Sequence, residues 1–134
     1  MKEQMSIENQ RTLAAYRYKR ANETLAEIPF LKQQGYYNTA VNRLYYACYY
    51  AAVAILIQHG INPGTHSGVK QMIGMHFVAT GRLPKELGRY FSLLFERRHS
   101  SDYDDFAYSS AEEIDELLPK ATAFIAAIGD LLKE

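Results

Sequence analysis

Residues 37–59 read YNTAVNRLYYACYYAAVAILIQH, and this stretch decides the fold. An apolar stripe runs along it at steps of three and four residues, the spacing of one helix face. The opposite side, which holds Tyr46 and Tyr50, has a single charge, Arg43, where a surface helix would be charged throughout. A helix that is apolar on nearly all sides lies at the centre of a bundle or in an oligomer interface.

Helical periodicity also marks the sequence on both sides of this stretch. Thr65 and Ser110 have the residue type of helix N-caps, and Glu113 completes a capping box with Ser110. No segment alternates apolar and polar residues as a strand would. The sequence therefore predicts an all-α, up-and-down bundle of four to five helices forming one domain, residues 1–134. The expected helices span about 7–34, 37–59, 65–79, 84–98 and 110 onward.

The chain is electrically neutral as a whole but not along its length. Its 134 residues include 15 Lys plus Arg and 15 Asp plus Glu. Residues 102–134 hold nine acids and two bases, whereas residues 1–101 hold thirteen bases and six acids. Neutrality argues against a protein that coats nucleic acid through a globally basic surface. A local phosphate site remains compatible with it.

The sequence argues against a disulfide, a membrane span, a metal site and a bound cofactor. Cys48 is the one cysteine, so an intrachain disulfide is impossible, and its apolar setting is typical of a core residue. The uncharged run 44–57 has fourteen residues, fewer than the roughly 20 needed to cross a bilayer. We therefore expect a cytoplasmic protein without a membrane span. No pair of the four histidines has ligand spacing, so we expect neither a metal nor a cofactor.

Arg98 is the residue that most needs an explanation. It occupies the next position of the fourth helix's apolar stripe, where a guanidinium must find a carboxylate, a carbonyl or a ligand phosphate. In one interpretation Asp102 pairs with it as a structural clamp. In the other, Arg98 binds phosphate or stabilises developing negative charge, with His99 or His66 as acid–base.

Two further basic groups are candidates. Asn42 and Arg43 lie on the tyrosine-rich helix, and Arg43 either shares a groove with Arg98, pairs with an acid, or reaches a dimer interface. The first helix interleaves bases with aromatic residues, a pattern that favours nucleic-acid binding but also occurs on solvated helix faces. That run comprises Tyr16, Arg17, Tyr18, Lys19 and Arg20.

Three motifs in order carry a resemblance to a known family. They are AVNRLYYA at 40–47, THSGV at 65–69, and FERR at 95–98 followed by DYDDF at 102–106. Together they resemble the HEPN superfamily, small helical domains named for nucleotide binding in higher eukaryotes and prokaryotes, and its short stand-alone prokaryotic branch most of all. The resemblance extends over about residues 8–132.

This resemblance implies a helical bundle, commonly a homodimer, that often pairs with a minimal nucleotidyltransferase as a toxin–antitoxin couple. Active members resemble metal-independent ribonucleases with an Arg and, four to six residues on, a His. Arg98 matches the family Arg, but residues 102–105 are Asp, Tyr, Asp and Asp. No His therefore follows Arg98 at the family spacing, and the ribonuclease motif is not intact. In paired systems the nucleotidyltransferase modifies a Tyr near this motif, and Tyr103 lies nearby.

Three functional hypotheses follow. The first is a dimeric module that binds nucleotide or RNA and acts with a nucleotidyltransferase partner. The second is an atypical ribonuclease in which Arg98 and His99 are catalytic, and the third is a non-catalytic dimer. The expected ligand-binding residues are Asn42, Arg43, Tyr46, His66, Arg97, Asp102 and Tyr103.

Overall fold

A computed structural model describes residues 6–103 and 108–134, with side chains described for 6–98 and 108–134. All secondary structure in these ranges is helical, which confirms the all-α prediction. The elements are α1 (Ile7–Gln33), α2 (Tyr37–Gln58), α3 (His66–Ile73), the π-helical turn η1 (Gly74–Val78), α4 (Lys85–Tyr103) and α5 (Ala111–Leu132).

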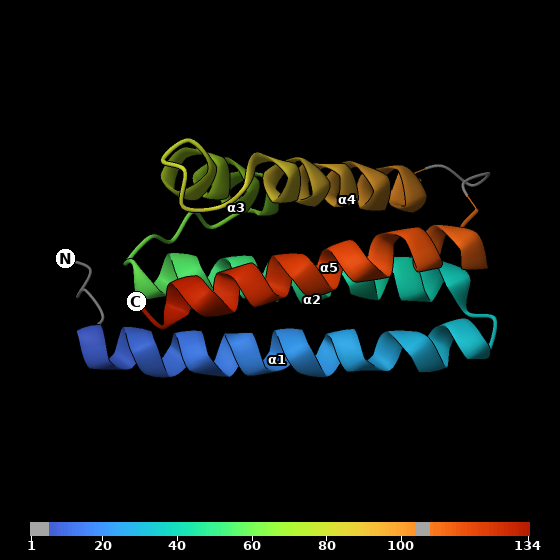
Figure 1. Cartoon of the computed structure of the whole chain (residues 1–134), viewed down its shortest axis with the longest axis horizontal. Helices are drawn as coiled ribbons and strands as arrows, with labels where there is room; N and C mark the ends of the chain where they lie inside the picture. The colour runs from blue at the N-terminus through green and yellow to red at the C-terminus, as the bar shows by residue number, and fades with distance from the viewer. Residues whose placement is uncertain (1–5, 104–107) are drawn as a thin grey trace.

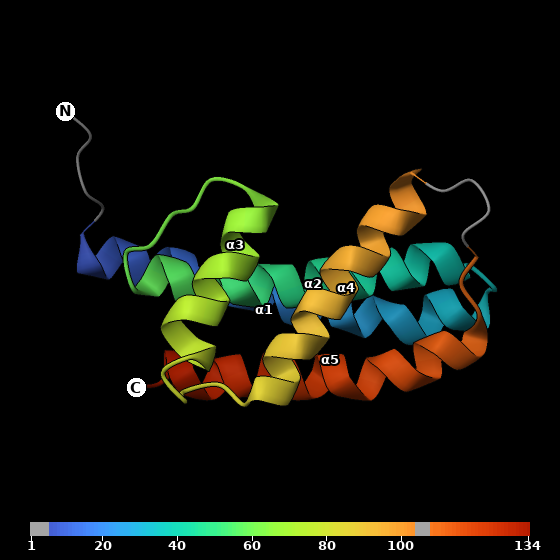
Figure 2. The same ribbon diagram turned by 90° about the horizontal axis from the view of Figure 1, so that it is seen from above.

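The helices form two layers around α2. The helices α1, α2 and α5 lie along the long axis of the molecule, and α3 and α4 cover them on one side (Figure 1). Seen from above, α4 crosses the lower layer obliquely, while α3 runs in the opposite sense beside it (Figure 2). The long helices α1, α2, α4 and α5 alternate in direction, as expected of an up-and-down bundle.

The second helix is central, as its sequence predicts. It packs against α1, α3, α4 and α5, and 11 of its 22 residues are buried. Five of these are alanines, whose small side chains allow neighbouring helices to approach its backbone closely. Cys48 is completely buried among them, which confirms its assignment to the core.

The helix α2 is also long enough and apolar enough to pass the length and composition test for a membrane span. It is the one helix of the described ranges that does so, and 61% of the relevant window is buried inside the bundle. Burial of this kind is what the core helix of a bundle requires.

The predicted helix boundaries are largely confirmed. Thr65 Oγ1 accepts a hydrogen bond from Gly68 N (2.9 Å), and Ser110 Oγ accepts one from Glu113 N (3.1 Å). Gly35 follows α1 with a φ of +80°, a conformation that favours glycine.

One boundary is wrong. The sequence places the end of the fourth helix near Arg98, with a polar loop after it, but α4 continues to Tyr103. Neither Gly nor Pro interrupts residues 99–103, so the backbone can remain helical there despite the polar side chains.

Gly129 of α5 tests the packing between α1 and α5, and Gly74 of η1 serves as its comparison. Tyr18 Oη donates a hydrogen bond to the carbonyl of Ile125 (2.9 Å), and a Cβ on Gly129 would lie 2.9 Å from Cζ of Tyr18 and closer to its hydroxyl. A Cβ on Gly74 would have no neighbour within 4 Å.

We therefore expect Gly129→Ala to lower the free energy of unfolding by about 1–3 kcal/mol, because Tyr18 must move. Gly74→Ala should instead raise it by about 0.5–1 kcal/mol. Urea unfolding followed by circular dichroism measures both, and equal effects would contradict the packing described here.

Candidate functional site

Arg98 lies against the rings of α2 instead of projecting into solvent. Its Nη2 donates a hydrogen bond to Tyr46 Oη (2.8 Å). Its guanidinium carbon is 5.1 Å from the centre of the Tyr46 ring and 5.6 Å from that of Tyr45. Cation–π attraction and a hydroxyl therefore hold a guanidinium that the apolar stripe of α4 carries into the bundle.

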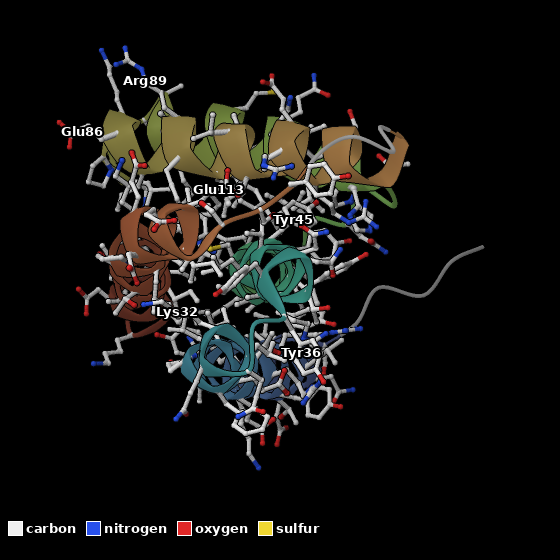
Figure 3. The ribbon with its side chains drawn as sticks, turned by 90° about the vertical axis from the view of Figure 1, so that its right-hand side faces the viewer. Lys32, Tyr36, Tyr45, Glu86, Arg89 and Glu113 are labelled. Carbon is white, nitrogen blue, oxygen red and sulfur yellow. The ribbon has the colours of Figure 1, made fainter. Side chains whose placement is uncertain are left out.

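His66, the first residue of α3, joins the same cluster. Its Nδ1 is 2.9 Å from Tyr45 Oη, and its ring stacks on Tyr49 with centroids 4.2 Å apart and planes 7° apart. Figure 3 shows Tyr45 between α2 and the α3–α4 layer. The geometry thus brings together two of the predicted site residues, Tyr46 and His66, with Arg98. We call Tyr45, Tyr46, Tyr49, His66 and Arg98 the ring cluster.

Burial determines the chemistry of Tyr45. Its side chain is 1% exposed, and this burial raises its pKa above the ordinary value, although the nearby Arg98 charge acts in the opposite direction. Tyr45 is therefore a neutral hydrogen-bonding group at physiological pH. When its O–H donates to His66 Nδ1, the proton of the neutral imidazole lies on Nε2.

A further cation borders the ring cluster. Lys70, one turn after His66 on α3, places its ammonium 4.6 Å from the centre of the Phe95 ring. The Phe95 ring is itself 6.3 Å from that of Tyr45. Sequence reasoning did not select Tyr49, Lys70 or Phe95 as site residues.

Arg97 has a different environment from its neighbour Arg98. It forms an ion pair with Glu113 at the start of α5 (Nε to Oε2, 3.2 Å). Its Nη2 also donates hydrogen bonds to the carbonyl of Tyr108 and to Ser109 Oγ, each at 3.0 Å. Glu113 lies between α5 and α4 in Figure 3. Arg97 thus links the C-terminal half of α4 to the start of α5.

Arg43 pairs with an acid, one of the three alternatives that the sequence allowed. Its Nε donates to Glu27 Oε2 on α1 (3.1 Å), and its Nη2 lies 3.5 Å from Thr24 Oγ1. Asn42 is half-buried beside it on α2. The hypothesis that Arg43 shares a groove with Arg98 therefore has no support from its contacts.

Three predicted site residues lie where no side-chain statement is possible. His99, Asp102 and Tyr103 fall within the backbone bounds of α4, but their side chains lie outside the described residues. Neither the Arg98–Asp102 clamp nor the catalytic role of His99 is tested, and both stay predictions.

Comparison with known proteins identifies the family. A model of the HEPN domain matches residues 14–131, nearly the whole chain. The protein belongs to the HEPN family. This confirms the resemblance carried by the three sequence motifs.

Individual relatives cover most of the HEPN chain. A "UPF0332 protein" of Thermotoga maritima is 34% identical over 119 residues, 89% of this chain and 90% of the relative. "Putative toxin MJ0142" of Methanocaldococcus jannaschii is 35% identical, with 79% and 72% covered. "Putative toxin MJ0605" of the same organism is 32% identical, with 85% and 84% covered.

The buried hydroxyl of Tyr45 predicts a loss of stability in alkali. Its pKa is raised in the folded state, so above about pH 10 the unfolded chain releases this proton first, and stability falls as pH rises. We expect the fall to reach about 1.4 kcal/mol per pH unit for this group. In Tyr45→Phe the free energy of unfolding should depend less steeply on pH between about 10 and 12. Parallel pH profiles for wild type and variant would contradict this prediction.

Proposed function

We propose that this HEPN protein is a toxin-like module that binds a phosphate-bearing ligand, a nucleotide or RNA, at Arg98. The single observation that carries the proposal is the position of the Arg98 guanidinium. It is half-buried against the ring cluster, where it contacts the hydroxyl of Tyr46 and the faces of the Tyr45 and Tyr46 rings. A guanidinium held in this way offers a rigid fork of donors to phosphate oxygens.

The surroundings of Arg98 also favour an anionic ligand with a ring system. Lys70 and His66 add basic groups on α3, and Tyr46 and Tyr49 are half-buried, so each ring exposes part of its surface. Stacking of a base on an aromatic ring and a phosphate on a guanidinium are the usual contacts in nucleotide recognition.

We further propose that the protein is a homodimer that acts with a minimal nucleotidyltransferase as a toxin–antitoxin pair. This part rests on the HEPN family membership and on the names of the two archaeal relatives, each called a toxin. Co-expression with the product of the neighbouring gene, followed by co-purification and light scattering, tests partner and dimer together. A monomer that retains no partner would contradict it.

Replacing Arg98 tests the phosphate site. We expect Arg98→Gln to weaken binding of uridine monophosphate by roughly 10- to 100-fold, the value of one charge-assisted hydrogen bond. The matched control is Arg89→Gln, because Arg89 is an exposed residue of α4 that points away from the bundle in Figure 3. Calorimetry measures both affinities. Equal affinities of a folded Arg98→Gln variant and the control would show that the site is elsewhere.

Ribonuclease activity is a second candidate because the fold brings His66 to the ring cluster. His66 lies 6.0 Å from the Tyr46 ring that Arg98 also contacts. In this mechanism Arg98 stabilises the negative charge that develops on the phosphorane. His66, as acid–base, takes the proton of the attacking ribose hydroxyl and returns a proton to the leaving oxygen.

The corresponding variant is His66→Ala, with His76→Ala as control, since His76 is an exposed residue of η1. We expect cleavage of a labelled RNA without added metal to fall about 100-fold or more in His66→Ala only. Wild-type protein that cuts no RNA, alone or with its partner, would eliminate this candidate.

A further inference from the structure

The aromatic surface of α2 continues beyond Arg98 toward α1, and the proposed phosphate site uses Tyr46 and Tyr49 of it but not Tyr50. Tyr46 and Tyr50 lie one helical turn apart, with ring centroids separated by 6.0 Å. The Tyr49 ring is 6.2 Å from each of them. All three side chains are half-buried, so their rings remain partly accessible. We call Tyr46, Tyr49 and Tyr50 the tyrosine row.

Two arginines of α1 border the far end of this row. The Arg20 guanidinium carbon is 6.0 Å from the centre of the Tyr50 ring, and its side chain is 37% exposed. Its ion pair with Glu23 (3.3 Å) lies at the surface, where such pairs contribute little, so a phosphate can compete for the guanidinium.

Arg17 lies one turn before Arg20 on α1. Burial raises the pKa of the Tyr49 hydroxyl, and the charge of Arg17 acts in the opposite direction. Arg17 Nε is buried and has no hydrogen-bond partner among the described residues. A buried N–H of a charged group requires an acceptor, and a ligand oxygen at this position would supply one.

The two groups of cations are separate. Arg98 lies over Tyr46, whereas Arg20 lies over Tyr50, one turn or about 5.4 Å farther along α2. The two guanidinium groups therefore lie over different rings of the row. The carboxylate of Glu27, two turns after Arg20 on α1, forms an ion pair with Arg43 (3.1 Å). A ligand with several phosphates and several flat rings fits this surface better than a mononucleotide.

We propose that Arg17, Arg20 and the tyrosine row form a second subsite, continuous with Arg98, that binds a single-stranded nucleic acid. The arginines contact successive backbone phosphates, and Tyr50 stacks against a base. The inference rests on the proposed function for the phosphate at Arg98. It extends the ligand from one nucleotide to a strand, and it assigns a role to the interleaved basic and aromatic residues of α1.

A second copy of this chain is a less suitable occupant of the same surface. In a symmetric dimer the same patch appears on both partners, so the interface would contain the arginines of both copies. Like charges in such contacts oppose association, whereas a polyanion neutralises them. The charges of the row therefore favour nucleic acid over self-association.

Two probes separate the subsites: a fluorescein-labelled 12-nucleotide oligouridylate, and uridine monophosphate. We expect Tyr50→Leu, which keeps an apolar side chain but removes the ring, to weaken oligonucleotide binding about tenfold. The double variant Arg17→Gln/Arg20→Gln should weaken it further and lower the slope of log affinity against log salt by about 1.4. Binding of the mononucleotide should be unchanged in both variants.

The matched control for charge is Lys19→Gln, since Lys19 belongs to the same helix but lines a groove against α5. We expect this variant to bind the 12-mer within twofold of wild type. A deoxyuridylate 12-mer measured in parallel separates recognition of the strand from recognition of ribose. Arg20→Gln alone changes an exposed side chain, so it remains informative if the double variant fails to fold.

Different outcomes identify which idea fails. If the Arg17, Arg20 and Tyr50 variants bind the 12-mer as Lys19→Gln does, while Arg98→Gln weakens both probes, the second subsite is wrong and the phosphate site stands. If Arg98→Gln binds both probes as wild type does, the proposed function is wrong. If Tyr50→Leu dissociates a dimer in light scattering and leaves oligonucleotide affinity intact, the row is a contact between copies, which overturns the subsite.

Discussion

The burial of α2 is the constraint on which the rest of the structure depends. Its uncharged segment exposes apolar atoms on all sides, so stability requires that other helices cover it almost completely. The buried alanines of α2 permit neighbouring helices to pack closely against it. Tyr45 is directed toward the layer of α3 and α4 (Figure 3), where its hydroxyl meets His66. Covering α2 thus requires helices on more than one side, which is why the bundle has two layers.

The same constraint accounts for the ring cluster. A tyrosine buried as deeply as Tyr45 loses water from its hydroxyl and must recover a hydrogen bond within the protein. His66 supplies it from α3, and Arg98 covers the neighbouring rings from α4. The upper layer therefore does more than shield α2, because it brings an imidazole and a guanidinium to one surface. The candidate site is a consequence of satisfying buried polar groups at the centre of the fold.

The sequence predicts the helices well because their signals are local. Caps such as Thr65 and Ser110 act within three residues, and the apolar stripes repeat within one or two turns. The partners of the arginines are not local. Arg98 meets Tyr46 across 52 positions, and Arg97 meets Glu113 across 16. The apolar periodicity of α4 shows that the Arg98 guanidinium needs a hydrogen-bonding partner. It cannot show that this partner is a tyrosine on another helix. The true end of α4 was missed for a related reason, since polar residues lower helix propensity without stopping a helix.

The three-dimensional arrangement also explains how a neutral chain can have a basic surface. The acids at the start of α5 are used locally, because Glu113 binds Arg97 and Asp115 binds Lys32 of α1. On the row itself, the acids described beside Arg20 and Arg43 are Glu23 and Glu27, both at its α1 edge. Net charge is therefore a poor guide to ligand charge here, because Glu113 and Asp115 are engaged in ion pairs between helices. Any ligand of this surface must supply its own negative charge.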